Sequence, residues 1–416
     1  MSLRMSFSLR LYRAATTALA PLLPWWLARR VRRGKEIAAR LDERYGIARI
    51  DRPAGRVVWV HCASMGETMS ALPLIGALAV QANVLLTTGT VTSAELAAQR
   101  AAAIHQFVPL DVPSHVARFL DHWRPDAAVF LESELWPNML GALDARGVPR
   151  FLFNARLSAR SAARWRRFPG AVRAIFGGFA VIAAQSRHDA AALRDLGLRD
   201  VESWGNLKFA TPDLPDDEAA RAALNAACPG PWLLAASTHP GEDIPVIEAH
   251  GALTRLHPSM TTVIVPRHPH RTDAIADLAR RYPLARRSRG EMPVPGGIYL
   301  ADTLGELGLF YRLCPLAFIG GTLVPVGGHN MIEAAQLGCA VVIGPHYENH
   351  FEAMKTLHAV GALVDVMDFM ELEATLARLM SNTARLAEMG AAGRSVCEGF
   401  ADLPERLARR VIEAIP

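Results

Sequence analysis

Residues 56–78, RVVWVHCASMGETMSALPLIGAL, and residues 231–253, PWLLAASTHPGEDIPVIEAHGAL, follow one plan that decides the fold. Each begins with a short apolar run, continues through a loop of small residues that ends in Gly-Glu, and then shows a helical pattern. Continuous apolar runs that alternate with helical segments are typical of parallel strands covered by helices on both faces. Two further pairs of segments repeat in the same order: residues 83–99 with 261–279, and residues 127–155 with 316–345.

The repeat predicts two similar domains of the α/β class, each a doubly wound, Rossmann-like parallel sheet. A chain of 416 residues is too long for one ordinary core, which agrees with two domains. Ligands of such domains bind at the carboxyl ends of the strands, so we expect the two domains to face a cleft in which two ligands react. The expected limits are residues 1–33 for an N-terminal segment, 34–205 for the first domain, 206–218 for a linker and 219–416 for the second domain, whose last helix is a candidate to pack back on the first.

Composition excludes several classes of protein. The chain is 51% hydrophobic with a net charge of +5, and no nucleic-acid-binding motif accompanies this modest positive charge. Its five cysteines form no CxxC pair, which indicates buried thiols rather than disulfides or structural zinc. Neither D-x-D nor HExxH occurs, so no bound metal is predicted. The first strand is not followed by GxGxxG, which argues against a dinucleotide oxidoreductase.

The N-terminal segment mixes Leu, Phe, Tyr and Trp with arginines over residues 3–33. Its uncharged stretch, Ala14–Ala28, is shorter than the ~20 residues that a spanning helix needs. Trp25 and Trp26 stand where a cleaved signal peptide would have small residues. We therefore favour a membrane-associated helix that lies in the interface, with its arginines toward anionic lipid. The alternative is a helix packed on the core of the protein itself.

The first candidate for catalysis is Glu67, which ends the loop after the first predicted strand. A carboxylate at the carboxyl end of a parallel strand suits a general base. The alternative is a glutamate in the first turn of a helix that only complements the helix dipole. The position of Glu67 in the sequence does not decide between the two.

A pair of carboxylates follows a later strand in FLESELWPN, residues 130–138. Glu132 and Glu134 flank one serine, so in extended backbone both side chains point the same way. Two such like charges raise one pKa unless a cation lies between them. The alternative is a helix start with Ser133 as its cap and Pro137 in its first turn, which explains the serine and the proline but not both glutamates.

Candidates for binding anions lie in the linker and the second half. Lys208, in GNLKF, could neutralise a carboxylate or phosphate near a cleft, although a lone linker lysine is usually solvated. Arg267, in PRHPHR, follows a predicted strand end and is placed for a phosphate or a base, the alternative being a solvated basic turn. Ser237, in the matching loop STHPGE, could present its hydroxyl and nearby amides to an anion.

The stretch GGHNMIEAAQLG, residues 327–338, carries more polar groups than a helix start needs. Its glycines allow close approach of the backbone, and His329 and Asn330 precede the predicted helix. Glu333 lies one turn along, where a carboxylate can accept two hydrogen bonds from a vicinal diol such as a ribose. The alternative is a capping box formed by Asn330 and Glu333.

Together these motifs resemble the 3-deoxy-D-manno-octulosonic acid (Kdo) transferase family. The resemblance runs from about residue 34 to residue 365 and rests on nine ordered motifs: WVHCASMGE, LTTGTVTSAE, FLESELWPN, NARLS, GNLKF, STHPGE, PRHPHR, DTLGEL and GGHNMIEAA. It implies a GT-B fold and an inverting transfer of Kdo from CMP-Kdo to a lipid A precursor (lipid IVA). It also implies that no metal or other cofactor is required and that the enzyme lies on the cytoplasmic face of the inner membrane, without a nucleic-acid partner.

The resemblance also implies residue roles. Glu67 matches the general base; Glu134, with Glu132 as second choice, and Lys208 match groups that stabilise the transition state. The positions that match the CMP site are Pro266, Arg267, Gly305, Glu306, Leu307, Asn330, Met331, Ile332 and Glu333, to which the pattern itself adds Ser237 and His329. The basic segment RRGKEIAARLDERYG supplies Arg32, Arg33, Lys35 and Arg40 for lipid A phosphates.

Two other functions are considered beside this one. The same fold serves transferases and epimerases that use a UDP-sugar, and a chain with this fold could also be a non-catalytic lipid- or nucleotide-binding module. The presence of the glutamates argues against the non-catalytic module.

Overall fold

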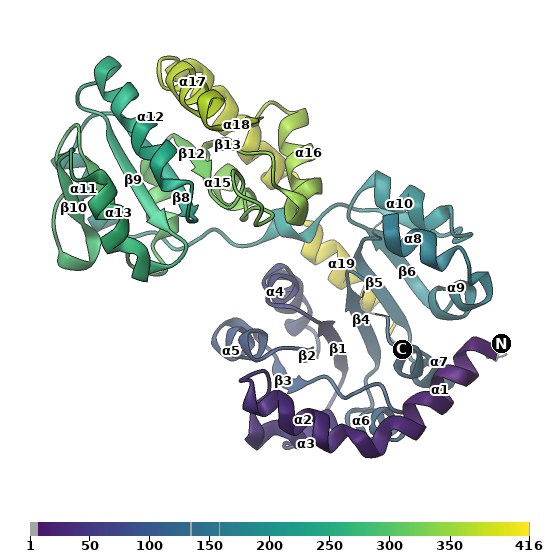
Figure 1. Cartoon of the computed structure of the whole chain (residues 1–416). Coiled ribbons are helices and arrows are strands. Elements are labelled where there is room, and N and C mark those ends of the chain that lie inside the picture. Colours follow the sequence, from purple (N-terminus) through teal and green to yellow (C-terminus); the bar gives the residue numbers. More distant parts are fainter. Residues whose placement is uncertain (1–6, 134, 158, 416) are drawn as a thin grey trace. The chain divides into compact units, whose positions relative to one another are not determined.

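The computed structural model describes residues 7–133, 135–157 and 159–415, which form two compact units (Figure 1). The first unit comprises the chain up to Thr211 together with the chain from Phe400 onward, and the second comprises Pro212–Gly399. The junction after Thr211 falls inside the segment 206–218 that the sequence marks as a linker.

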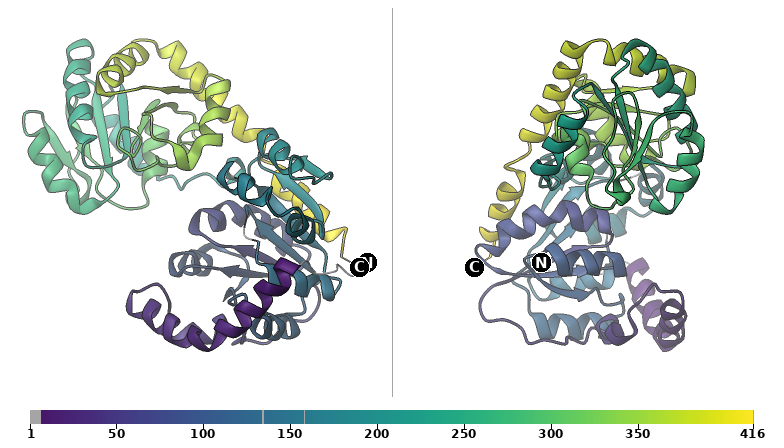
Figure 2. Two further views of the ribbon diagram at one scale, coloured as in Figure 1. Left: turned by 45° about the vertical axis from the view of Figure 1, so that its right-hand side comes forward. Right: turned by 90° about the vertical axis from the view of Figure 1, so that its left-hand side faces the viewer.

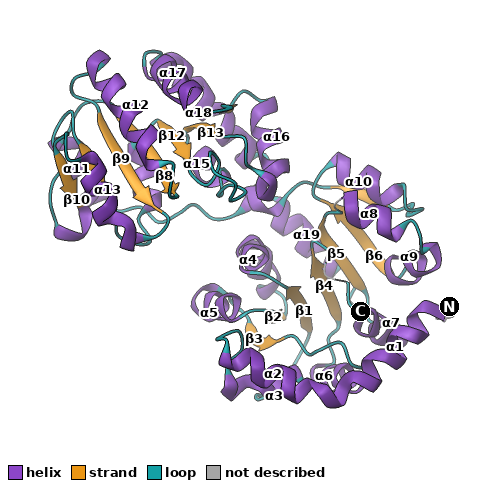
Figure 3. Ribbon diagram, in the orientation of Figure 1, coloured by secondary structure: helices purple, strands orange, loops and turns teal. Residues whose placement is uncertain are grey.

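The first unit is built on a seven-stranded parallel sheet with the order β3-β2-β1-β4-β5-β6-β7 (Figure 3). Its strands are β1 (Val57–Cys62), β2 (Asn83–Thr88), β3 (Ile104–Phe107), β4 (Ala127–Leu131), β5 (Arg150–Ala155), β6 (Phe179–Ala184) and β7 (Val201–Ser203). Because β1 pairs with both β2 and β4, the strand order reverses beside it. The carboxyl ends of β1 and β4 therefore form the switch point at which such sheets bind ligands.

The second unit repeats this plan in a parallel sheet with the order β10-β11-β9-β8-β12-β13-β14. Its strands are β8 (Trp232–Thr238), β9 (Thr261–Pro266), β10 (Leu284–Arg286), β11 (Ile298–Leu300), β12 (Leu316–Ile319), β13 (Ala340–Ile343) and β14 (Leu363–Asp365). Here β8 pairs with β9 and β12, as β1 does with β2 and β4. The predicted pair of doubly wound parallel domains is confirmed.

Helices cover the sheets, and the apolar runs fill the layers between. The helices of the first unit are α1 (Phe7–Leu19), α2 (Leu23–Arg32), α3 (Leu41–Arg44), α4 (Met65–Ala79), α5 (Val91–Arg100), α6 (Pro113–Trp123), α7 (Pro137–Ala145), α8 (Ala159–Trp165), α9 (Pro169–Phe176), α10 (Arg187–Arg194) and α19 (Leu403–Ile412). Those of the second unit are α11 (Glu218–Ala227), α12 (Asp243–Leu256), α13 (Thr272–Ala279), α14 (Leu307–Leu313), α15 (Ile332–Gln336), α16 (Phe351–Ala359), α17 (Phe369–Met380) and α18 (Thr383–Glu398). Every residue of β1 and β4 is buried, which explains why these strands read as continuous apolar runs.

The last helix, α19, packs on the first unit. Leu403, Leu407 and Val411 recur at intervals of four residues, so they share one face of the helix. All three are buried in the same cluster as Leu74 and Leu78 of α4. The apolar stripe of α19 therefore completes the core of the unit in which the chain begins.

The N-terminal helices α1 and α2 run along the outside of the first unit, as the purple ribbon in Figure 2 shows. On their inner side, the Tyr12 hydroxyl donates a hydrogen bond to the Asp111 carboxylate (3.0 Å), and the Asn138 amide donates to the Thr16 hydroxyl (3.0 Å). Their outer side exposes large apolar residues: Leu11, Leu19, Leu22, Trp25 and Trp26. One face thus packs on the protein, while the other presents apolar side chains to the surroundings.

The described helices include none with the length and apolar character that crossing a membrane would require.

The buried His61 of β1 makes stability depend on pH. Its Nδ1 lies 2.9 Å from the Thr87 hydroxyl, and burial lowers its pKa from about 6.5 to about 4. Between these two pKa values His61 is protonated in the unfolded chain but not in the folded chain. The free energy of unfolding therefore decreases as the pH falls below about 6.5. We expect His61 alone to reduce the free energy of unfolding by about 2 kcal/mol between pH 7.5 and pH 5.

Urea denaturation of the wild type and of His61→Gln at both pH values measures this contribution. The variant should lose less stability on acidification, because glutamine does not titrate. The same loss in both proteins would contradict the prediction.

Candidate active site and donor site

An acidic centre lies at the carboxyl ends of β1 and β4 in the first unit. Glu67 is in the first turn of α4, after the cap residue Ser64. One carboxylate oxygen of Glu67 accepts a hydrogen bond from the Ala63 amide (2.8 Å), and the other accepts one from the Ser64 hydroxyl (3.0 Å). These donors orient the carboxylate, whose residue is only 8% exposed. Glu67 therefore lies in the first turn of α4, where the alternative from the sequence places it, and its role as general base stays a prediction.

Glu132 is the first residue after β4 and has a left-handed backbone with φ of 55°. Its carboxylate lies 3.1 Å from the Lys208 ammonium and 3.7 Å from the Arg156 guanidinium. The structure thus joins two residues, Glu132 and Lys208, that the sequence singled out separately. Glu134, the preferred member of the predicted pair, lies outside the described residues.

Glu67 and Glu132 both act on Cys62, the last residue of β1. Burial raises the pKa of the Cys62 thiol well above its usual range, and the negative charges of Glu67 and Glu132 add to this effect. The two carboxylates therefore lie close to the same buried thiol, although they come from different strand ends. The thiol remains protonated at neutral pH.

Two asparagines that the sequence analysis missed hold Lys208 in place. Lys208 lies in a short 3₁₀ turn, Leu207–Ala210, whose cap is Asn206. The Asn206 side chain accepts a hydrogen bond from the Lys208 amide (3.0 Å), and the Asn154 side chain accepts one from the Leu207 amide (3.0 Å). The recurrence of asparagine in the quoted motifs NARLS and GNLKF was the available signal.

In the second unit, a fully buried carboxylate joins the ends of β8 and β12. Glu242 accepts hydrogen bonds from four backbone amides, those of His239 (2.8 Å), Gly321 (2.7 Å), Thr322 (3.1 Å) and Leu323 (2.9 Å). It is 0% exposed. Glu242 occupies the place in the repeat that Glu67 occupies in the first half. The repeat in the sequence predicts this match, but the pattern alone gives Glu242 no role.

Ser237 lies near the end of β8 at an irregularity in the pairing with β9. Its backbone is left-handed, with φ of 60°. A side chain at Gly320 would place its Cβ 2.5 Å from the Ser237 carbonyl oxygen, so only glycine fits there. The loops that follow β8 and β12 thus approach each other closely. The suggested contact of Ser237 with an anion stays a prediction.

Arg267 and three histidines gather beyond the carboxyl ends of β8 and β9. Arg267 follows the buried Pro266, and its amide donates to the Thr238 carbonyl (3.0 Å) while its side chain is exposed. The Nε2 atoms of His239 and His329 lie 2.8 Å apart, and the ring of His268 meets that of His239 edge-on.

The charges of this group act on its own imidazoles. Burial, together with the nearby His239, Arg267 and His268, lowers the pKa of His329 to about 4. The pKa of His239 is lowered too, first by burial. Both rings are therefore neutral at pH 7, and Arg267 supplies a permanent positive charge that suits an anion.

The stretch that follows His329 forms a short helix. Helix α15 begins at Ile332, and its cap residue Met331 provides no side-chain hydrogen bond. The Asn330 side chain instead accepts from the Ile332 amide (3.2 Å) and donates to the Glu333 carboxylate (3.0 Å). Burial raises the pKa of Glu333, and the hydrogen bond from Asn330 partly offsets this.

Ahead of this helix, Gly327 and Gly328 turn the chain with φ of 94° and 80°. Met331 and Ile332 are 0% exposed, so their side chains belong to the core.

The segment Gly305–Glu306–Leu307 forms the start of α14. Gly305 turns the chain with φ of 86°, and Leu307 is half-buried. Glu306 forms an ion pair with Arg287 (2.6 Å), which lowers the pKa of that carboxyl group. The described contacts thus give Glu306 a partner inside the second unit.

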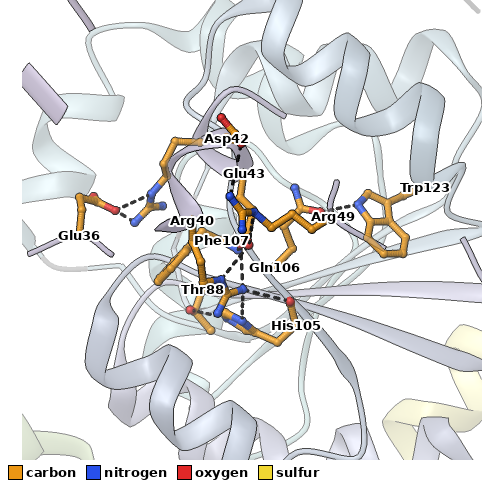
Figure 4. Close-up of polar contacts among 11 residues, drawn as sticks. Glu36, Arg40, Asp42, Glu43, Arg49, Thr88, His105, Gln106, Phe107 and Trp123 are labelled. Atoms are coloured by element: carbon orange, nitrogen blue, oxygen red, sulfur yellow. Dashed lines mark hydrogen bonds and ion pairs between the residues drawn. The ribbon is translucent and has the colours of Figure 1, made fainter. Parts of the chain in front are cut away.

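Of the four residues expected at lipid phosphates, Arg32, Arg33 and Lys35 are exposed. Arg40 differs, because its guanidinium forms an ion pair with Glu43 (2.7 Å) and donates to the His105 carbonyl (3.2 Å), as Figure 4 shows. It also stacks over the Phe107 ring at 4.7 Å. These contacts give Arg40 a structural role in linking the chain around α3 to β3.

The architecture and the loops at the carboxyl ends of both sheets define a class, the proteins of GT-B fold. Solved structures with this fold include UDP-GlcNAc 2-epimerase from Neisseria meningitidis, which is 13% identical with a TM-score of 0.59 over 86% of this chain and 100% of that one. MurG from Acinetobacter baumannii is 12% identical with a TM-score of 0.56 over the same shares. These likenesses concern the fold alone.

Comparison of sequences then gives the particular family. A family model described as 3-Deoxy-D-manno-octulosonic-acid transferase (kdotransferase) matches residues 39–211. The 3-deoxy-D-manno-octulosonic acid transferase of Bordetella pertussis is 35% identical over 97% of this chain and 98% of its own, and that of Haemophilus influenzae is 33% identical over 86% and 87%. The chain belongs to the Kdo transferase family and is a glycosyltransferase.

Proposed function

We propose that this enzyme transfers Kdo from CMP-Kdo to a lipid A precursor, lipid IVA, with inversion at the anomeric carbon and without a metal or other cofactor. The observation that carries the proposal is the acidic centre, in which Glu67 and the Glu132–Lys208 pair lie at neighbouring strand ends beside Cys62. The reaction belongs to lipopolysaccharide synthesis at the cytoplasmic face of the inner membrane.

In the proposed step, Glu67 accepts the proton of an acceptor hydroxyl while that oxygen forms a bond to the anomeric carbon of Kdo. The bond from that carbon to the phosphate oxygen breaks, and its electron pair leaves with CMP. One base and no nucleophile suffice for such a single displacement, which inverts the carbon. The hydrogen bonds from the Ala63 amide and the Ser64 hydroxyl hold the Glu67 carboxylate in a fixed orientation at the strand end, as a general base requires.

Lys208 and the carboxylates beyond β4 would stabilise the charge that develops in this step. The ammonium of Lys208 is held beside Glu132, and preorganised charges of this kind stabilise a transition state without costly rearrangement. Of the two glutamates in FLESELWPN, the sequence favours Glu134 over Glu132 for stabilising the transition state.

The donor would bind at the strand ends of the second unit. The exposed guanidinium of Arg267, beside the neutral His239–His329 pair, suits the phosphate of CMP. Asn330 and Glu333 offer an amide and a carboxylate for the ribose hydroxyls. The remaining predicted contacts would come from Ser237, Pro266, Gly305, Glu306, Leu307, Met331 and Ile332.

The exposed face of α1 and α2 would hold the enzyme at the membrane surface. It combines tryptophans and leucines with arginines, including Arg32 and Arg33, as interfacial helices do. This placement brings the first unit to a substrate that is itself anchored in the membrane.

Mass spectrometry of the product from purified enzyme, CMP-Kdo and the lipid A precursor tests the proposal. We expect a mass increase of whole Kdo residues, and we expect CMP but not UDP to compete with a fluorescent cytidine nucleotide for binding. Competition by UDP together with transfer from a UDP-sugar would contradict the donor assignment. Binding of nucleotide without any product under single-turnover conditions would support a non-catalytic module instead.

A further inference from the structure

The first unit carries an arginine-rich surface that the proposed chemistry leaves unused. Residues 145–188 contain nine arginines and no aspartate, glutamate or lysine. Five of these arginines are exposed on α8, on α9 and in the turn between them. We call them the α8–α9 arginine surface: Arg160, Arg164, Arg166, Arg167 and Arg173.

The side chains of this surface have no acidic partner in the described parts of the chain. Three other arginines of the same stretch do have one, because Arg146 pairs with Asp121, Arg150 with Asp144 and Arg156 with Glu132. Arg160 and Arg164 are also one helical turn apart, where like charges repel each other. A group of positive charges that repel each other and that no described acidic residue neutralises suits an anion from outside.

The surface begins beside the acidic centre. Arg156 follows β5, lies 3.7 Å from Glu132, and precedes Arg160 by four residues. Helix α8 contacts α9, α9 contacts α7, and α7 contacts the N-terminal helix α1. Figure 1 allows the reader to follow this series of helices along one side of the first unit. An anion bound on α8 and α9 therefore lies between the catalytic carboxylates and the helix expected at the membrane.

We propose that the α8–α9 arginine surface binds the phosphate groups of the glycolipid acceptor, an inference that rests on the proposed function. The guanidinium group forms paired hydrogen bonds with phosphate, which the ammonium of lysine does not. Phe168 lies within the surface and is 52% exposed, so it offers an apolar contact beside the charges. Continuity with Glu132 through Arg156 favours the acceptor over phospholipid headgroups. Arg40, by contrast, is engaged by Glu43 and Phe107.

Steady-state kinetics of the full chain with the double variant Arg164→Ala, Arg167→Ala tests the proposal. We expect KM for the phosphorylated lipid A precursor to rise about tenfold while kcat changes less than twofold. With the same acceptor after enzymatic removal of its phosphates, the wild type and the variant should have similar KM values. Replacing both arginines by lysine should restore only part of the wild-type KM.

Arg199→Ala is the matched control, because Arg199 is an exposed arginine of the same unit outside this surface. An equal rise of KM for both acceptors would overturn the proposal, since it would indicate a structural effect. Weaker sedimentation of the double variant with phosphatidylglycerol vesicles, without a difference between the acceptors, would assign the surface to the membrane and also overturn it. Absence of transfer by the wild type would contradict the proposed function, whereas transfer with unchanged KM values would contradict only this inference.

Discussion

Glu67→Gln should lower kcat for Kdo transfer by about a hundredfold to ten-thousandfold, the usual contribution of a general base. Glutamine fits the site, because its oxygen can accept from the Ala63 amide and its NH₂ group can donate to the Ser64 hydroxyl. The fold and the donor site should therefore survive while the proton acceptor is lost. Initial rates at saturating CMP-Kdo and lipid A precursor measure the effect.

Ser64→Ala is the control for this substitution, because it removes the helix cap and one donor to Glu67 but keeps the carboxylate. It should cost about 1 kcal/mol of stability and much less activity than Glu67→Gln. Calorimetry should show equal CMP binding by all three proteins. If Glu67→Gln keeps more than a tenth of the wild-type kcat, Glu67 is not the base.

Glu242→Ala should destabilise the second unit by about 3–5 kcal/mol, because each buried donor left without its acceptor costs about 1–3 kcal/mol. The substitution leaves four amides without their acceptor, those of His239, Gly321, Thr322 and Leu323. These amides hold the loops after β8 and β12 together at the proposed donor site. Urea denaturation followed by circular dichroism measures the change in the free energy of unfolding.

Glu248→Ala provides the matched control, because Glu248 is an exposed glutamate on the same helix, α12. It should change stability by less than about 0.5 kcal/mol. Glu242→Gln should lie between the two, since its single oxygen can still accept from some of the amides. Equal stability of the Glu242 and Glu248 variants would show that the four hydrogen bonds contribute nothing.

The repeat could be recognised in the sequence because its strands are buried on both faces and therefore appear as continuous apolar runs. Segments 56–78 and 231–253 become β1–α4 and β8–α12, with Glu67 and Glu242 at matching places. The different surroundings of the two glutamates could not be predicted from the sequence. Glu242 is enclosed because the glycine-rich loop after β12 folds over it, and a sequence pattern does not show which loop closes over which carboxylate.

Contacts between segments that are far apart in the sequence also could not be predicted. The pair Glu132–Lys208 depends on a left-handed backbone at Glu132 and on the cap that Asn206 forms, neither of which follows from local propensity. Arg40 looked like a free basic residue, yet it pairs with Glu43 three residues later and stacks on Phe107 far along the chain. Charge alone therefore did not separate residues available to a ligand from those used within the fold.

The return of the chain to the first unit gives the enzyme a modular construction. The chain leaves this unit after Thr211 and re-enters it at Phe400, and the rings of Phe209 and Phe400 are 5.5 Å apart. Both crossing points are therefore neighbours, and residues 212–399 are an insertion with adjacent ends. A donor domain of another sugar specificity could be exchanged as a cassette at these two points, without cutting the core that α19 completes.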